Sequence, residues 1–484
     1  MKMLLVLLES AIKQGAQKNG KKKNTSRLLV GQVRIDFTSK TITPYGGIAS
    51  VIAKFIEKID FRSWVESSMP VEEKSNNGGG IYEKVLGQFL ITLCGGFRFG
   101  HLWFDRGMDA LLATFGVKWL PSAASTLTRF WGKIKTQLQA EQLGESARAL
   151  SCRLLQWCGA TSGSLRFDSS VITLYGNQEG ARKGYNPKKP GRKSHHPLLA
   201  FVDGGFVVNL WNRSGDTFAG HRAIDFFNQT FTSLAKISYK VRRVLCDSGF
   251  YLIEFIEHLE NKGLTYIMAA RIYRPLQNRI MKIENWERVT DGIEVGDFWF
   301  EHEDEKWDKP RRYVAVRQFV PERPQATGKQ LNLFVEFEQW KNYRISLFIT
   351  NDHESSPEKI WRDYRPRATD ENVIKELKEN YGMAAFNMKN FWATEAVMVI
   401  EALVFHNMIQ FMNRNLFNKN GISQTLQTLR SKYFVIGAQL GSGGRKKVLR
   451  LSVTDRKLKS KIIWIMEQIH RMPETFNCIA FDTS

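Results

Sequence analysis

Hydrophobic residues recur every three or four positions over two early segments, residues 48–68 and 82–94. This spacing places the apolar side chains on one face of an α-helix. The tract SNNGGG between the two segments has the small and polar residues of a flexible connection. The pattern therefore predicts two amphipathic helices joined by a loop.

A third helical segment, residues 120–134, carries polar side chains on an otherwise apolar helix. Pro121 and Ser122 indicate a helix start, and Thr126, Thr128 and Arg129 project from the residues that follow. This arrangement is typical of the recognition helix of a helix-turn-helix. It is equally typical of a capped helix in a bundle, and the pattern does not choose between the two.

After residue 163 the pattern changes to short apolar and alternating runs. Strands are predicted at residues 165–176, 197–204, 206–215, 240–249 and 264–272, with helices at residues 221–236 and 250–263. Three strands, a helix, a strand, a helix and a strand predict an α/β fold with a mixed sheet.

The strand runs of residues 273–350 are more polar and rich in Trp, which predicts an antiparallel β insertion. These runs cover residues 291–303, 311–319, 331–340 and 343–350. Helix is predicted again from Pro366 and over the apolar residues 391–416. The last segments predict a hairpin that turns on GSGG and a basic helix, over residues 433–453 and 456–472.

The net charge of the chain indicates what kind of partner it binds. The 484 residues include 70 Lys and Arg against 48 Asp and Glu, a formal net charge of +22. Such an excess favours a polyanion, and nucleic acid is the first choice. A membrane is the rival, but we expect no apolar run that approaches the roughly 20 residues of a spanning helix.

The cysteines and the chain start bear on the compartment. None of the five cysteines forms a CxxC pair, so neither a zinc site nor a disulfide framework is indicated, and a reducing cytoplasm fits best. The apolar start ends at Leu8 and is followed by a basic tract in place of a cleavage site, which does not fit a signal peptide.

Common catalytic motifs are absent from the sequence. There is no HExxH, GxSxG or Walker motif. The segment GSGGRKK could bind a phosphate, although a hairpin turn is the simpler interpretation. His195 and His196 have no partner at metal-ligand spacing and fit a structural role.

Two carboxylates stand at unusual places. Asp168 lies inside a predicted strand, where Asp is disfavoured. Asp247 ends an apolar strand and precedes Ser-Gly, so taken alone it fits a turn. Because ligand sites of α/β sheets gather at strand ends, the two acids together predict one cleft.

The stretch YRPRATDENVIKELK contains four polar residues at helical spacing. Tyr364, Arg367, Glu371 and Lys378 fall within an arc of roughly 60° on a helix. Pro366 indicates a helix start, so this geometry holds only from Arg367 onward. Spacing alone is equally compatible with a solvated face that carries ion pairs.

A resemblance adds to this pattern. Tyr364-x2-Arg367-x3-Glu371-x6-Lys378 matches the Tyr-Arg-Glu-Lys motif of DDE transposases of bacterial insertion sequences. Residues 167–199 and 246–251 resemble the first-Asp and second-Asp regions of that group. The similarity extends from residue 42 to the C-terminal hairpin and implies an RNase H-like catalytic domain interrupted by the β insertion.

The resemblance also implies roles for individual residues. Asp168, Asp247 and Glu371 would bind Mg²⁺, for which Mn²⁺ can substitute. Oxygen ligands suit both ions, and two such ions can activate a nucleophile and stabilise the leaving oxygen in phosphoryl transfer. Tyr364, Arg367 and Lys378 would contact DNA phosphates near the cut.

A basic segment follows Asp168 and contains no acid between Gly180 and Val202. Its glycines and prolines predict a loop. A solvated charge run is the usual interpretation, but beside a two-metal site we expect it to bind the DNA backbone. The residues expected to do so are Arg182, Lys183, Lys188, Lys189, Arg192 and Lys193.

The insertion holds three further candidates, Trp299, Trp307 and Trp340. Transposases of this motif class can pass through a hairpinned DNA end with a Trp stacked on a flipped base. Tryptophans of an insertion are more often core residues, and the sequence does not choose among the three.

These observations divide the chain as follows. We expect an apolar start and basic arm, a helical DNA-binding region, a first catalytic part, the β insertion, a helical second catalytic part, and a basic C-terminal hairpin and helix, at residues 1–41, 42–160, 161–272, 273–350, 351–420 and 421–484.

The resemblance implies a transposase that binds terminal inverted repeats, cleaves the DNA ends and joins the 3′-hydroxyls to target DNA. It would act on double-stranded DNA as a homo-oligomer, a dimer, at the bacterial nucleoid and not at a membrane. An inactive or domesticated DNA-binding protein and a nuclease without strand transfer are the alternatives.

Overall fold

The computed structural model describes residues 29–30, 32–73, 79–302, 307–320, 340, 342–386, 388–417 and 423–474. It contains two compact units, Met1–Thr41 and Ile42–Ser484. In the first, β1 (Leu29–Val30) pairs with β2 (Val33–Arg34). The apolar start, most of the basic arm and most of the predicted strand at 331–340 lie outside the described residues.

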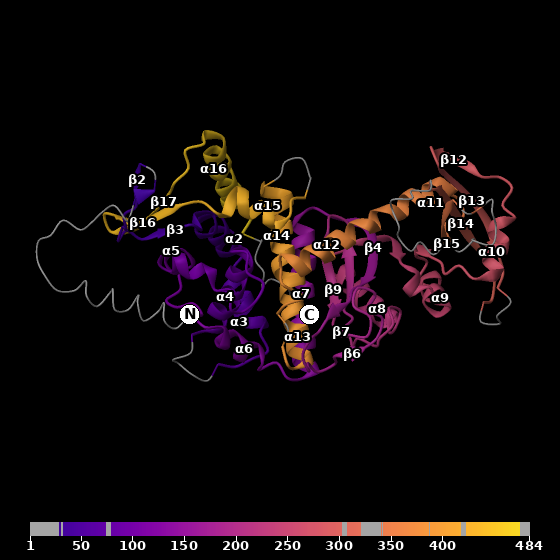
Figure 1. Ribbon diagram of the computed structural model, residues 1–484, viewed down its shortest axis with the longest axis horizontal. Helices are drawn as coiled ribbons and strands as arrows, with labels where there is room; N and C mark the ends of the chain where they lie inside the picture. The colour runs from indigo at the N-terminus through magenta and orange to yellow at the C-terminus, as the bar shows by residue number, and fades with distance from the viewer. Residues whose placement is uncertain are drawn as a thin grey trace, which may run out of the picture. The chain divides into compact units, whose positions relative to one another are not determined.

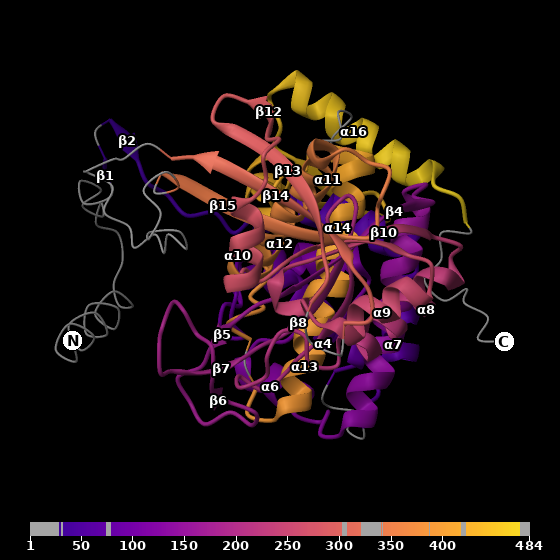
Figure 2. The same cartoon turned by 90° about the vertical axis from the view of Figure 1, so that its right-hand side faces the viewer.

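The larger unit contains a nine-stranded mixed sheet (Figures 1 and 2). β10 is parallel to both β4 and β11, and every other pairing in this sheet is antiparallel. The order is β12 (Glu287–Thr290), β13 (Ile293–Phe300), β14 (Arg311–Phe319), β15 (Tyr343–Thr350), β11 (Thr265–Ala269), β10 (Lys240–Cys246), β4 (Ser162–Ser169), β8 (Leu198–Val202) and β9 (Phe206–Trp211).

The alternating runs after residue 163 are thus confirmed as strands of one α/β sheet. The first run is shorter than predicted, because β4 ends at Ser169 and β5 (Ile172–Thr173) belongs to another sheet.

The antiparallel strands predicted after residue 273 continue this same sheet. β15 pairs with β11, and β14, β13 and β12 follow it outward, at the right of Figure 1. A small hydrophobic core that includes Val314, Phe348 and Ile360 joins these strands to α11 (Pro357–Tyr364). The insertion thus continues the sheet through the pairing of β15 with β11, and α11 buries the apolar face of its strands.

The two faces of β4 are covered by different helices. Phe167 packs against Phe226 of α8 (Ala223–Lys236) and Phe255 of α9 (Ile253–Asn261). Successive side chains of a strand point to opposite faces, so Arg166 and Asp168 face the other side, where α12 (Ala368–Glu379) lies. Both predicted helices between the strands are confirmed.

A continuous helix covers Phe391–Phe417 and includes α13 (Phe391–Val399), η7 (Ile400–Phe405), α14 (His406–Met412) and η8 (Asn413–Phe417). Its mean hydropathy of 1.3 and its length would suffice to cross a membrane. The expectation that no apolar segment approaches that length was therefore wrong. The most apolar 18 residues of this helix are wholly buried inside the protein, as is usual for a core helix.

The early helices form, with shifted boundaries. The predicted helix over 48–68 is divided at Asp60, whose φ of 51° is left-handed, into α2 (Ala53–Lys58) and α3 (Phe61–Ser68). The next prediction corresponds to α4 (Ile81–Leu93). α6 (Ala124–Trp131) starts later than Pro121 and exposes Thr128 and Arg129.

The C-terminal hairpin consists of β16 (Ala438–Gly443) and β17 (Lys446–Leu451), followed by α16 (Arg456–Arg471). It turns after GSG, at Gly444, whose positive φ of 63° suits glycine. β16 also pairs with β3 (Ile42–Thr43), so residues from opposite ends of the sequence share one sheet.

Candidate active site

Two carboxylates lie together at the ends of neighbouring parallel strands. Asp168 is next to last in β4, and Asp247 directly follows β10, where its carboxylate accepts a hydrogen bond of 2.8 Å from the backbone of Gly249. Cys246 is paired with Phe167 in the parallel ladder. This register places the two acids at the same edge of the sheet, as the sequence predicted.

Arg367 lies between these acids. Its Nη2 is 3.1 Å from Oδ1 of Asp168 and 3.3 Å from Oδ2 of Asp247. The side chains of Arg367 and Asp168 are only 11% and 10% exposed, so water screens their charges weakly. Two carboxylates thus converge on one positively charged nitrogen.

The electrostatics explain why a cation belongs here. Burial raises the pKa of Asp168 to about 7, Arg367 opposes this shift, and Asp247 adds to it. Burial lowers the pKa of Arg367, but Asp168, Tyr364 and Asp247 outweigh it, so the net pKa is raised. Oxygen donors that share a positive charge fit Mg²⁺ or Mn²⁺, and Asp168 and Asp247 are residues that could hold such an ion.

Tyr364 and Lys378 lie around the same strand ends. The Tyr364 hydroxyl donates to the carbonyl of Cys246 at 3.1 Å, and Lys378 Nζ donates to the carbonyl of Val171 at 2.9 Å. Burial, followed by the nearby Lys188, lowers the pKa of Lys378 to about 8. Tyr364 ends α11, and η6 (Arg365–Arg367) joins it to α12, so α12 starts after Pro366.

Glu371 is placed differently. It is exposed on α12, one helical turn after Arg367. Among the described residues there is no group of three or more His, Cys, Asp or Glu side chains spaced to hold a metal ion. The structure thus joins Asp168 and Asp247 but does not gather Glu371 with them, and the role of Glu371 stays a prediction.

A buried ion pair beside the acids was missed by sequence reasoning. Arg166 Nε donates to Asp370 Oδ2 at 2.8 Å, and Arg166 Nη2 donates to the carbonyl of Val202 at 2.8 Å. Asp203 also pairs with Arg166. The available signals were Arg166, two residues before Asp168 on the same strand face, and Asp370, next to Glu371.

The two histidines have structural partners. His195 Nε2 lies 2.9 Å from the carbonyl of Glu179. His196 Nδ1 lies 2.6 Å from the carbonyl of Thr217, and its Nε2 lies 3.1 Å from the hydroxyl of Ser169, the neighbour of Asp168. His196 is therefore closer to the acids than its sequence context suggested.

The basic segment was predicted to be a loop, but part of it forms two short strands. β6 (Arg182–Lys183) and β7 (Lys193–His195) pair in a small sheet of order β5-β7-β6, because the backbone groups on either side of the Gly-Pro turns meet each other. All six predicted basic residues are exposed, and within the described residues none forms an ion pair with an acid. They are Arg182, Lys183, Lys188, Lys189, Arg192 and Lys193.

The three tryptophans differ in exposure. Trp340 is 5% exposed and contacts Trp286, so it belongs to the core. Trp307 stacks on His302 with centroids 3.8 Å apart. Trp299 is 49% exposed and stacks on His353.

With this geometry in place, comparison with known proteins decides the family. The family model described as "Transposase DDE domain group 1" matches residues 27–473. The chain belongs to this family. DDE transposases carry out DNA transposition, and a metal-binding acidic site is their common feature.

Two other comparisons add little. No curated protein matches the chain. A cryo-EM structure of a piggyBac transposase synaptic complex with hairpin DNA is similar, with 11% identity and a TM-score of 0.41, over 88% of this chain and 81% of that one.

Proposed function

We propose that this DDE transposase is the active enzyme of a bacterial insertion sequence. It binds the terminal inverted repeats, cleaves the DNA ends and joins the 3′-hydroxyls to target DNA by two-metal phosphoryl transfer. It acts as a homodimer on double-stranded DNA in the bacterial cytoplasm. The observation that carries this proposal is the convergence of Asp168 and Asp247 on the Arg367 guanidinium.

The sheet order supports an RNase H-like catalytic domain. β9, β8, β4, β10 and β11 are consecutive neighbours, β4, β10 and β11 are parallel, and β8 is antiparallel. Asp168 and Asp247 are at the carboxyl ends of two adjacent parallel strands. Ligand sites of open α/β sheets lie at such ends.

Each motif residue has a proposed role. Asp168, Asp247 and Glu371 hold Mg²⁺ or Mn²⁺, which supplies Lewis-acid activation of the nucleophile and the leaving oxygen. The planar guanidinium of Arg367 suits a phosphate oxygen pair. Lys378 adds a second cation at the ends of β4 and β10, and Tyr364 holds the backbone at Cys246.

Two adjacent acids on α12 compete for the third ligand position. Both carboxylate oxygens of Asp370 accept hydrogen bonds from Arg166, at 3.0 and 2.8 Å, and Asp370 is fully buried. Glu371 is exposed. This difference supports Glu371 as the metal ligand and Asp370 as a residue that positions α12.

The test is metal-dependent cleavage of DNA that contains the element ends. We expect Asp168→Asn, Asp247→Asn and Glu371→Gln each to lower the cleavage rate by about 100-fold or more, since each removes a metal ligand. Binding to the same DNA, measured by gel shift, should persist. Glu379→Gln, exposed on the same helix, is the matched control and should cleave normally.

The outcomes separate the alternatives. Cleavage that persists in all three variants would overturn the site. Cut ends without joined molecules would identify a nuclease without strand transfer. Binding without cleavage by the unaltered protein, with Mg²⁺ or Mn²⁺ present, would identify a DNA-binding relative.

A further inference from the structure

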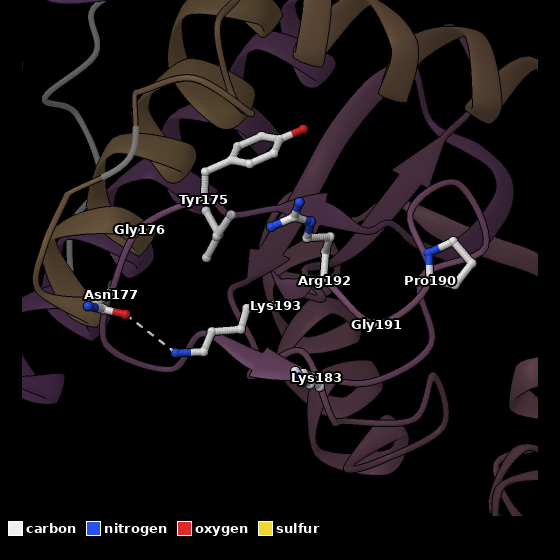
Figure 3. Close-up of a pocket in the computed structure, with 9 residues that line it drawn as sticks. Tyr175, Gly176, Asn177, Lys183, Pro190, Gly191, Arg192 and Lys193 are labelled. Atoms are coloured by element: carbon white, nitrogen blue, oxygen red, sulfur yellow. Dashed lines mark hydrogen bonds between the residues drawn. The ribbon is translucent and has the colours of Figure 1, made fainter.

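A pocket opens on the small sheet β5-β7-β6 (Figure 3). Its volume is about 370 Å³, within the usual range for small-molecule sites of about 300–1,000 Å³. Tyr175, Asn177, Lys183, Pro190, Arg192 and Lys193 are among the residues that line it. No acidic residue is in its lining.

The pocket presents an aromatic ring to solvent. Tyr175 is 70% exposed, so its ring is open to a ligand from solvent. Lys189 Nζ lies 5.0 Å from the ring centroid and also contacts the hydroxyl. An exposed aromatic ring among cations is the arrangement on which nucleic-acid bases stack.

Three cationic side chains line the pocket together with this ring. Figure 3 shows the Arg192 side chain directed toward Tyr175, and Lys193 Nζ donates to Asn177 Oδ1 at 3.4 Å. Lys183 is the third cation of the lining. A ligand that satisfies all of these groups has a planar ring and a negative charge, as a nucleotide has.

The sheet that forms the pocket is fixed to the strand that carries Asp168. The Ser170 amide donates to the carbonyl of Pro197, and the Leu174 amide donates to the carbonyl of Lys193, both at 2.9 Å. Lys378 of the motif bonds to Val171 between them. Six residues separate Asp168 from Tyr175, which limits the distance between them to about 25 Å, a span that a DNA strand of several nucleotides can cover.

We propose that this pocket binds one unpaired nucleotide of a DNA strand, with the base stacked on Tyr175 and the phosphate held by Arg192 and Lys193. The inference rests on the proposed function, because it takes DNA as the partner. The faces of bases inside a duplex are covered by their neighbours, so a duplex can offer its phosphates to the pocket but no free ring. The pocket therefore favours single-stranded or splayed ends.

The experiment measures binding by the full chain in EDTA, where no cleavage occurs. Fluorescence anisotropy compares a labelled single-stranded oligonucleotide with a blunt duplex of the same sequence. We expect Tyr175→Ala to weaken single-strand binding about tenfold and to leave duplex binding within about twofold. Tyr175→Phe keeps a ring and should bind as the unaltered protein does.

Tyr185 provides the matched control. It is 74% exposed on the same segment but does not line the pocket, so Tyr185→Ala should not change either affinity.

Arg192→Ala should lower the salt dependence of single-strand binding by about 0.7 in the slope of log K against log salt. The fluorescence of a 2-aminopurine placed in the single-stranded oligonucleotide should be quenched when the unaltered protein binds, but not when the Tyr175→Ala variant binds.

Equal losses on single strand and duplex, no loss in Tyr175→Ala, or the same loss in Tyr185→Ala would overturn the pocket. These outcomes are separate from those of the cleavage test. A chain that cuts no DNA yet loses single-strand affinity in Tyr175→Ala would refute the proposed function and keep the pocket. If the unaltered protein cleaves DNA normally and Tyr175→Ala keeps its single-strand affinity, the pocket would be refuted and the proposed function kept.

Discussion

At the residue scale, the buried Arg166–Asp370 pair holds α12 against β4. Arg166 is 2% exposed and Asp370 is fully buried, and they are 204 residues apart in the sequence. A buried ion pair adds little net stability over apolar packing, but loss of one partner leaves the other charge uncompensated. The pair therefore fixes which of two adjacent acids on α12 turns inward.

We expect Asp370→Asn to destabilise the protein by about 3–5 kcal/mol, the usual cost of breaking a buried pair. Asp203→Asn is the control, because its side chain is 53% exposed, and it should cost less than about 1 kcal/mol. Urea unfolding followed by circular dichroism measures both. Equal losses of unfolding free energy in the two variants would show that the buried pair with Asp370 stabilises the protein no more than the exposed pair with Asp203 does.

A second prediction concerns Arg367, which shares the two acids that we expect to bind metal. Arg367→Gln removes the competing positive charge and should tighten Mn²⁺ binding about tenfold, or about 1.4 kcal/mol. Without metal the variant should melt at a lower temperature, because two close carboxylates then repel each other. Isothermal titration calorimetry and thermal melts, each without DNA, measure these effects, and unchanged Mn²⁺ affinity would contradict the prediction.

At the element scale, the long helix Phe391–Phe417 joins the N-terminal helices to the sheet. Phe405 stacks on Phe89 of α4 with centroids 4.4 Å apart. Asn407 accepts from the Val207 amide of β9 at 3.0 Å. Glu401 accepts hydrogen bonds from Gln88 and Thr92 of α4, inside this apolar interface.

Glu401 should make stability depend on pH. Burial raises its pKa well above the ordinary value, against the opposing hydrogen bonds from Gln88 and Thr92. The folded state therefore retains a proton that the unfolded chain releases near its pKa of about 4.3. This contribution is complete below that pH and is lost as the pH rises through the folded pKa, by about 1.4 kcal/mol per unit.

Glu401→Gln keeps the hydrogen-bonding shape without the titration. Its unfolding free energy should fall less between pH 5 and pH 8 than that of the unaltered protein. Urea unfolding across this range tests it, with Glu379→Gln on the exposed surface of α12 as the control that keeps the original slope. Parallel pH profiles for all three proteins would refute the role of Glu401.

At the scale of the whole molecule, the net charge of +22 favours polyanion binding, but only its distribution indicates where. The exposed basic residues of β6, β7 and their connection lie on the segment that follows Asp168. α8 and α9 cover the opposite face of the sheet, away from Asp168. Cations on the two faces should therefore contribute unequally to DNA binding.

We expect the double variant Lys188→Ala and Lys189→Ala to lower the salt slope of duplex binding by about 1.8, since each lost phosphate contact removes about 0.9. The matched control replaces two exposed lysines at the ends of α8 and α9, Lys236→Ala and Lys262→Ala. Anisotropy titrations at several salt concentrations measure both slopes. Equal slopes for the two double variants would show that binding follows total charge alone.

The sequence by itself determined the elements and the order of the acids, because periodicity, turn residues and motif spacing act over a few neighbouring residues. Asp168 in a strand and Asp247 at a strand end were predictable for that reason. Tertiary structure alone decided that Arg367 lies between them, that Asp370 is buried while Glu371 is exposed, and that the inserted strands prolong the central sheet. It also folded the basic segment into a sheet with a pocket that displays Tyr175. These features depend on strand pairing, burial and charge contacts between residues far apart in the chain, as between Arg166 and Asp370, and local patterns do not encode such contacts.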